Sequence, residues 1–593
     1  MPSIGNGHIA TNIFSDTVYL NGLYNGEKGE SRRARIPGWA NIRLNSTLSH
    51  HLYAPIYSLD TKRGIFEVKV DRERSVVKQR IYAHRFYTRA IINQIEISAK
   101  PHVGKSFVES CKPFEPTYKI FVNINMVKLQ MSIVLQETGE DLLEKHIVEW
   151  QKLHDEAGME IEGDLKLSKI VNGIWYYFLS SLPSRRSFQA PDRFYGLSPT
   201  GLARGGSFED YEGHNFWDTE IWIFPSILLL YPHFAEKLLQ YRLQTAYIAA
   251  ELAKMTGNKG YRFPWESAYT GREVTQPCCP AIAEFEQHVS GCIAFAARQY
   301  LALTRDESWL KNGGCSIVTN IAEFWASRAH FCHKKANHFY FLFLIIDVMG
   351  PDEDHCNVTN SVFTNVVAGY SLYLAQYVAC LCKSYYTAKD PDQWADIAWS
   401  LSLPYDEELD YHPQFSGYER PDKIKQADAV LLGFPLQYPM KESTRANDLN
   451  YYESVTRGSG PAMTWSMHTI GHLHLDENLR AATLFNKSYT EYVREPFKVW
   501  SELRRPKIGA INFFTGMGGF LQALIFGYAG ISVHLDKLVI KKPQLPPETS
   551  KFKIKGSKEG ENTWAGKAFH LSIVLHKESG PPFIINYYFH LQE

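Results

Sequence analysis

Four ionisable side chains follow a glycine-proline pair in the segment MGPDEDH. Asp352, Glu353, Asp354 and His355 are consecutive there. Crowded carboxylates raise one another's pKa, which suits a general acid that must hold a proton near neutral pH. The segment lacks the D-x-[DN]-x-[DN]-G spacing of a calcium loop. It predicts a general acid or, as the simpler alternative, a solvated acidic loop.

Two further pairs of residues could bind a sugar. Trp217 and Asp218, in GHNFWDTEIW, place an aromatic ring beside a carboxylate, so that a pyranose could stack on the ring while its hydroxyls donate to the carboxylate. The alternative is a helix start with Asp218 as its cap. Lys425 and Gln426, in DKIKQADAVLL, can donate to sugar hydroxyls, although such a pair is also ordinary helix surface.

Candidate bases lie in YVREPFKVWSE, where Glu495 precedes a proline and Glu502 follows a few residues later. Either carboxylate could take a proton from water. The next segment, NFFTGMGGF (512–520), is rich in glycine but matches neither GxGxxG nor a Walker loop, so it does not indicate nucleotide binding.

The spacing of apolar residues predicts the elements that position these side chains. Residues 65–71 and 91–98 alternate with a period of two, which predicts strands of an antiparallel sandwich. Residues 140–156 predict a connecting helix, and 166–530 change to a helical period, which suggests a helical toroid or a solenoid. Residues 565–576 return to a period of two, which predicts a small C-terminal β domain.

Composition narrows the class of protein. The 593 residues carry 63 basic and 63 acidic side chains, and this zero net charge argues against a general binder of nucleic acid or anionic membranes. No apolar run is long enough to span a bilayer, and no signal peptide is visible. The nine cysteines show neither a disulfide array nor metal-site spacing. We therefore expect a reduced, cytoplasmic setting without a metal or an organic cofactor.

The motifs form an ordered series that resembles glycoside hydrolase family 65. The series runs from NGHIATNIF through GHNFWDTEIWIFPSILLLYP, MGPDEDH, KQAD and GPAMTWSMH to EPFKVW. The resemblance extends over most of the chain and implies a multidomain α+β fold. The implied parts are an N-terminal β-sandwich (1–135), a helical linker (136–165), an (α/α)6 catalytic barrel (166–530) and a small, perhaps incomplete C-terminal β domain (531–593).

The same resemblance implies roles for the candidate residues. Glu353 would be the general acid, and Trp217–Asp218 with Lys425–Gln426 would bind glucose. Glu495 would be the base, with Glu502 the weaker choice. The reaction would invert an α-glucoside, which needs carboxyl groups roughly 6.5–9.5 Å apart in opposite protonation states. The implied substrate is glucose on the galactosyl-hydroxylysine of collagen-type glycopeptides, and no metal or cofactor is required.

Two alternatives stay open at this point. A phosphorylase of maltose, kojibiose or trehalose would replace the base with a phosphate-binding loop, but GAINFFTGMGG (509–519) has few hydroxyls. A catalytically impaired sugar-binding homologue is the other alternative. Two departures from the family pattern support it: segment 101–145 is short, and segment 329–348, just before the acidic loop, is unfamiliar and apolar.

Overall fold

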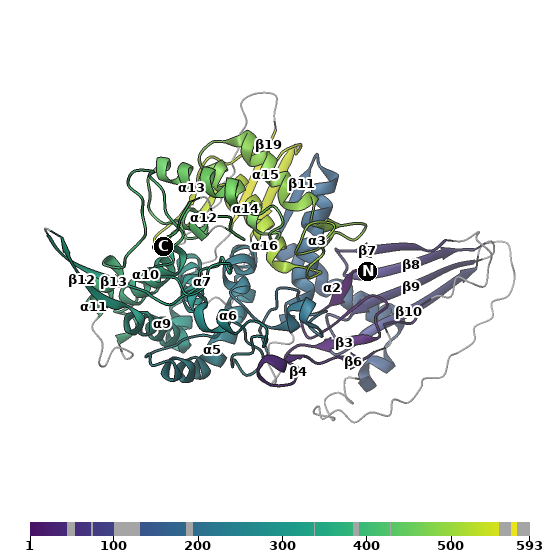
Figure 1. The fold of residues 1–593 in the computed structure, drawn as a ribbon. Helices are drawn as coiled ribbons and strands as arrows, with labels where there is room; N and C mark the ends of the chain where they lie inside the picture. Colours follow the sequence, from purple (N-terminus) through teal and green to yellow (C-terminus); the bar gives the residue numbers. More distant parts are fainter. Residues whose placement is uncertain are drawn as a thin grey trace.

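The computed structural model describes most of the chain: residues 1–38, 40–43, 54–72, 75–99, 131–185, 194–336, 338–383, 391–420, 422–426, 428–556 and 571–577. Most of the short segment 101–145 lies outside these residues. Figure 1 shows a sheet-rich N-terminal part beside a larger helical body, so the chain is a multidomain α+β protein.

Two four-stranded antiparallel sheets form the N-terminal part. The first has the order β1 (Ser3–Gly5), β2 (Ile9–Asn12), β3 (Thr17–Leu20) and β6 (Ile36–Pro37). The second has the order β10 (Ile91–Ala99), β9 (Ser75–Ala83), β8 (Ile65–Asp71) and β7 (Ile56–Asp60). A short ribbon of β4 (Tyr24–Asn25) and β5 (Arg32–Arg33) extends toward the helical body.

The strands predicted at 65–71 and 91–98 are confirmed as β8 and β10. Phe66, Val68 and Val70 form the buried face of β8, as the alternation indicates. Ile95 and Ile97 of β10 are exposed instead, so their apolar face is left open to solvent in this chain.

The helix predicted at 140–156 is confirmed as α2 (Gly139–Glu156), which starts at a capping box made by Thr138 and Asp141. Its Trp150 is fully buried and packs so closely on the β7–β8 turn that a side chain at Gly64 would collide with the indole. The predicted linker also contains a strand, β11 (Gly158–Glu162). It pairs with β18 (Lys551–Lys555), which in turn pairs with β19 (Ser572–His576).

Helices dominate the rest of the chain, as their periodicity predicts. The longer ones are α3 (Leu165–Ser181), α4 (Phe224–Leu230), α5 (Pro232–Met255), α7 (His288–Thr304), α9 (Cys315–Arg328), α10 (Val362–Tyr377), α11 (Pro391–Trp399), α13 (Glu442–Val455), α14 (Thr464–His474), α15 (Asn478–Thr490) and α16 (Phe514–Gln522). Short helical segments connect them: η3 (Phe208–Gly213), η4 (Thr219–Ile223), α6 (Pro280–Phe285), α8 (Glu307–Trp309), η5 (Leu310–Gly314), α12 (Asp428–Gly433) and η7 (Ala523–Tyr528).

Three two-stranded ribbons interrupt this helical body. They are β12 (His330–Ala336) with β13 (His338–Leu344), β14 (Val493–Arg494) with β15 (Val499–Trp500), and β16 (Ile531–Val533) with β17 (Leu538–Ile540). The β12–β13 hairpin accounts for most of the unfamiliar segment 329–348.

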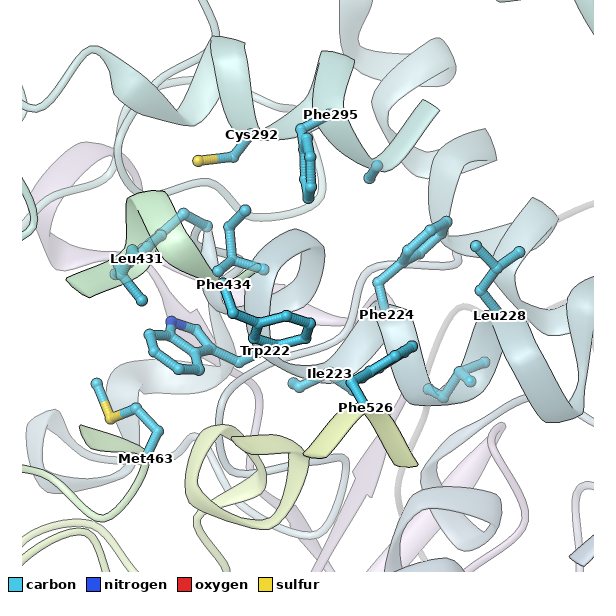
Figure 2. Packing of buried hydrophobic residues seen from close by; sticks show 14 of the residues in the cluster. Trp222, Ile223, Phe224, Leu228, Cys292, Phe295, Leu431, Phe434, Met463 and Phe526 are labelled. Atoms are coloured by element: carbon cyan, nitrogen blue, oxygen red, sulfur yellow. The ribbon is translucent and has the colours of Figure 1, made fainter. Parts of the chain in front are cut away.

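The helices share one continuous hydrophobic core. Figure 2 shows side chains from α4, α7, α12 and η7 pointing toward one another, with Phe434 beside Phe526 at a ring-centre separation of 5.3 Å. Trp222 lies in the same layer, near Leu431 and Met463. This buried layer holds the segments that carry the candidate site residues.

The expectation that the cysteines are reduced is wrong for one pair. Cys315, at the start of α9, and Cys382 form a disulfide with a Cα–Cα distance of 5.5 Å. No local pattern predicts this pair, because the two residues are 67 positions apart and only tertiary packing brings them together.

Among the described helices, none combines the length and the apolar character needed to cross a membrane.

Candidate functional site

The acidic loop after Gly350 is anchored by Asp352. This carboxyl is buried and accepts hydrogen bonds from the Lys425 backbone N–H (2.9 Å) and the Gln414 side chain (3.1 Å), while His355 Nδ1 lies 2.9 Å away. Burial raises the pKa of Asp352. The loop is therefore not the solvated acidic segment of the simpler alternative.

Gly350 shows how tightly the loop packs on the start of α12. A Cβ atom at this position would lie 2.1 Å from Asp428 Oδ2, so no other residue fits without moving the chain. On the preceding side, the Arg328 guanidinium donates to the carbonyls of Ile346 and Asp347. The unfamiliar hairpin thus leads into a loop that is fixed at both ends.

Glu353 projects from this loop with its side chain 27% exposed, and its Oε1 accepts a hydrogen bond from Lys425 Nζ at 2.6 Å. Burial by itself would lower the pKa of Lys425. The negative field of Glu353, with Glu286 and Glu502 further away, outweighs burial and raises that pKa. Lys425 is therefore a charged ammonium that contacts Glu353 and feels the charges of Glu286 and Glu502.

Gln426 continues from Lys425 into the interior. Its Nε2 donates to the carbonyl of Pro351, which joins it to the acidic loop. Gln426 also lines a cavity of about 10 Å³, together with Trp222, Val430, Leu431, Thr464, Met467 and His468. A cavity of that size holds about one water molecule.

Asp218 lies just before η4, where Thr515 Oγ1 of α16 donates to its Oδ1 at 2.6 Å. Burial is the main reason that the pKa of Asp218 rises to about 7. The Thr515 hydrogen bond opposes this rise, whereas the fields of Glu502 and Glu353 add to it. Asp218 can thus change between acceptor and donor near neutral pH.

Trp217 does not offer the open stacking face that the sequence suggests. The side chain is only 3% exposed and packs edge-to-face on His288 at a centroid distance of 4.9 Å, and on Trp222 and Phe363 at 5.6 Å. Trp217 is therefore a buried residue packed among other aromatic rings, next to Asp218 in the chain. The motif predicts the pair but not the direction in which the ring points.

The two candidate bases have different surroundings. Glu495 is at the tip of the β14–β15 hairpin, with its side chain 60% exposed and paired with Lys498. Glu502 is partly buried, and its two oxygens accept hydrogen bonds from Tyr211 (2.8 Å) and from the Ala510 backbone N–H (3.0 Å). The structure therefore brings Glu502, and not Glu495, to the other candidate residues.

Tyr211 is a site residue that the sequence analysis missed. It and Glu212 both adopt positive φ angles, 52° and 51°, which non-glycine residues rarely do. Burial raises the pKa of Tyr211, and the carboxyls of Glu502 and Asp218 raise it further. The strained turn thus points a phenol at the space between the carboxyls, and no local sequence signal announces it.

Two more buried groups flank the site. Glu286 Oε2 lies 2.8 Å from His288 Nε2, and burial raises the pKa of this carboxyl well above its usual value. Glu212, His214 and Glu266 form a buried cluster in which His214 Nδ1 lies 2.7 Å from Glu266. Only the His214–Glu266 contact is a hydrogen bond within this cluster, and among the described residues Glu212 Oε2 and His214 Nε2 have no partner.

Comparison with known proteins places this geometry among carbohydrate-active enzymes. Residues 192–424 match the glycosyl hydrolase family 65 central catalytic domain. The chain is 33% identical to the protein-glucosylgalactosylhydroxylysine glucosidase of Gallus gallus, over 94% of this chain and 86% of that protein. It is 34% identical to a kojibiose hydrolase of Flavobacterium johnsoniae, over 70% of this chain and 57% of that protein.

The fold has a solved counterpart. A structure described as a kojibiose phosphorylase from the human microbiome superposes with a TM-score of 0.72 at 17% sequence identity. The match covers 97% of this chain and 91% of that one. At this identity the likeness supports the fold and not the substrate.

Proposed function

Because the chain belongs to glycoside hydrolase family 65, we propose that it is an inverting glucosidase that releases an α-linked glucose with Glu353 as its general acid. The observation that supports the proposal is that Glu353, hydrogen-bonded to Lys425, and Glu502 both act electrostatically on Lys425 and on Asp218, which indicates one shared site. Inversion requires two carboxyl groups in different roles on opposite faces of the sugar.

The finer architecture is part of this proposal. The helical region from 166 to 530 would be the (α/α)6 barrel of the family, with a β-sandwich over 1–135 and a linker over 136–165. A small β domain would occupy 531–593. The pairing of β11 with β18 joins the linker to that last domain.

We assign the acid role to Glu353 because Lys425, which contacts it in the free enzyme, would donate to the hydroxyls of a bound sugar instead. In the free enzyme the Lys425 ammonium donates a hydrogen bond to Glu353. A bound glucose would draw Lys425 to its hydroxyls, and water would leave the site. Glu353 would then hold a proton and donate it to the glycosidic oxygen, so that the aglycone leaves as an alcohol.

We propose Glu502 as the base in place of Glu495. The Tyr211 phenol and the Ala510 amide hold its two oxygens in a fixed direction. Ionised Glu502 would take one proton from water as the water oxygen bonds to the anomeric carbon and the glycosidic C–O bond breaks. The product is β-glucose, and the Glu502 proton returns to solvent.

Glucose recognition would fall to Asp218, Lys425 and Gln426. Asp218 accepts from a sugar hydroxyl once it has lost its own proton. Trp217 contributes by closing the wall behind Asp218, not by stacking on the sugar. The rest of the substrate would be a galactosyl-hydroxylysine of collagen-type glycopeptides, which the name of the Gallus gallus relative and its high coverage support.

A phosphorylase reaction is less well supported by the site. A carboxylate at Glu502 would repel inorganic phosphate from the face that the water must attack. The hydroxyl of Thr515 is already donated to Asp218 and is not free for phosphate. Both features favour water as the acceptor.

Glucose release from glucosylgalactosyl-hydroxylysine, with and without phosphate, tests the proposal. We expect free glucose that does not depend on phosphate, and a loss of about 10²- to 10⁴-fold in kcat for Glu353→Gln. Turnover that appears only with phosphate would show a phosphorylase. A folded wild type without turnover on this substrate, maltose, kojibiose or trehalose would show the impaired sugar-binding homologue.

A further inference from the structure

Helix α14 carries two buried histidines on one face. His468 and His472 are four residues apart, which places their side chains on the same side of a helix. His468 is 1% exposed, and neither of its ring nitrogens has a hydrogen-bond partner. Buried polar atoms are nearly always paired, so an unpaired imidazole indicates a missing partner.

Glu453 on the neighbouring helix α13 completes a group of three. One ligand atom from each of Glu453, His468 and His472 can be chosen so that all lie within 4.8 Å of one another. His472 Nε2 and Glu453 Oε2 are 3.1 Å apart. Two ligands of one tetrahedral zinc ion, each about 2.0–2.2 Å from the metal, are separated by a similar distance.

The second nitrogen of His472 strengthens the case. Its Nδ1 lies 2.7 Å from Glu477 Oε2, so both ring nitrogens face carboxylate oxygens. A neutral imidazole that donates from Nδ1 to Glu477 turns a lone pair toward Glu453. Two acceptors at 3.1 Å require a positive species between them, either an extra proton on the ring or a metal ion.

The positive side chains nearby do not offset the negative charges of both Glu453 and Glu477. Arg480 Nε donates to Glu453 Oε2 at 2.9 Å, and its NH1 donates to Asn450. Arg480 thus offsets the charge of Glu453 but not that of Glu477. It gives His468 no hydrogen-bond partner. Lys487 Nζ, 3.3 Å from the centre of the Trp465 ring, is a further cation whose charge acts on His468.

We propose that Glu453, His468 and His472 bind a divalent transition-metal ion, with Zn²⁺ the best chemical match. Two imidazoles and one carboxylate are a common zinc ligand set, and water would fill the fourth position. Glu477 orients His472 from behind, as carboxylates do for zinc-bound histidines. The site would hold α13 against α14, whose Thr464, Met467 and His468 line the same cavity as Gln426. It takes no part in glycoside cleavage and does not rest on the proposed function.

The test measures zinc in the full-length protein after incubation with ZnCl₂ and removal of unbound metal. We expect the wild type to retain about one more Zn²⁺ per chain than His468→Ala or His472→Ala, and to unfold at a higher temperature with zinc than after chelation. Glu477→Gln should weaken zinc binding by about 10- to 100-fold. His474→Ala, on the same helix but outside the group, is the matched control and should bind as the wild type does.

Zinc held by the exposed Cys278 or adjacent Cys279 would persist in the histidine variants, so only the difference in stoichiometry counts. Circular dichroism of each metal-free variant separates loss of the site from loss of the fold. If a folded wild type retains no more zinc than folded His468→Ala, and zinc leaves its unfolding temperature unchanged, the proposal is wrong. His472 then only bridges Glu453 and Glu477 by hydrogen bonds.

Discussion

Asp218 should set the acid limb of the pH profile for the free enzyme. Its pKa is raised to about 7, mainly by burial, and a protonated carboxyl cannot accept a sugar hydroxyl as a carboxylate does. Since pH profiles of kcat/KM report groups of the free enzyme, kcat/KM should rise as pH increases through about 7.

Thr515→Val tests this assignment. The substitution keeps the shape of the side chain but removes the hydrogen bond that stabilises ionised Asp218. The pKa of Asp218 should rise, so kcat/KM should fall more at pH 6 than at pH 8, by roughly threefold or more. A uniform loss across the pH range would show that Thr515 acts only on packing.

Glu502→Gln and Glu495→Gln form a matched pair for the identity of the base. Loss of a general base costs about 10²- to 10⁴-fold in kcat. We expect that loss for Glu502→Gln, while Glu495→Gln should stay within about twofold of wild type because the Glu495 side chain is exposed and paired with Lys498. The reverse result would restore Glu495 as the base.

At the scale of elements, periodicity predicts much of this fold. The strands at 65–71 and 91–98 and the helix at 140–156 follow from local spacing, and they lie where expected. The pairing of β11 with β18 could not be predicted, because almost 400 residues separate the two strands. Local patterns give elements, whereas long-range pairing depends on which edges tertiary packing brings together.

The same limit explains what the sequence analysis missed at the site. Glu353 and Lys425 are 72 residues apart, and their motifs mark each as a candidate without predicting the contact between them. The sequence favours Glu495 over Glu502 as the base, but the surroundings of the two carboxyls depend on which way a short hairpin points. Tyr211 meets Glu502 across 291 residues and lies in a strained turn without a motif.

The Cys315–Cys382 disulfide makes a prediction for the helices that it joins. Closing a loop of 67 residues stabilises a fold by about 4 kcal/mol in the chain-entropy description. Cys315→Ser should therefore lower the unfolding temperature under oxidising conditions, whereas Cys380→Ser, at an exposed free cysteine, should not. Equal unfolding temperatures for wild type and Cys315→Ser would mean that the thiols are unpaired.

At the scale of the whole molecule, the N-terminal sheets help to build the site. Arg33 of β5 is fully buried and donates to the carbonyls of Gly201, Leu202, Arg204 and Gly213. These carbonyls flank the turn that carries Tyr211. The N-terminal part thus braces the turn whose Tyr211 phenol donates to Glu502.

The central claim is that one carboxyl protonates the leaving group while another activates water on the opposite face. Proton NMR of the first glucose released, recorded before mutarotation, tests it most directly. We expect the first product to be β-glucose from an α-linked substrate, in phosphate-free buffer. Release of α-glucose as the first product would mean retention through a covalent intermediate and would contradict the roles given to Glu353 and Glu502.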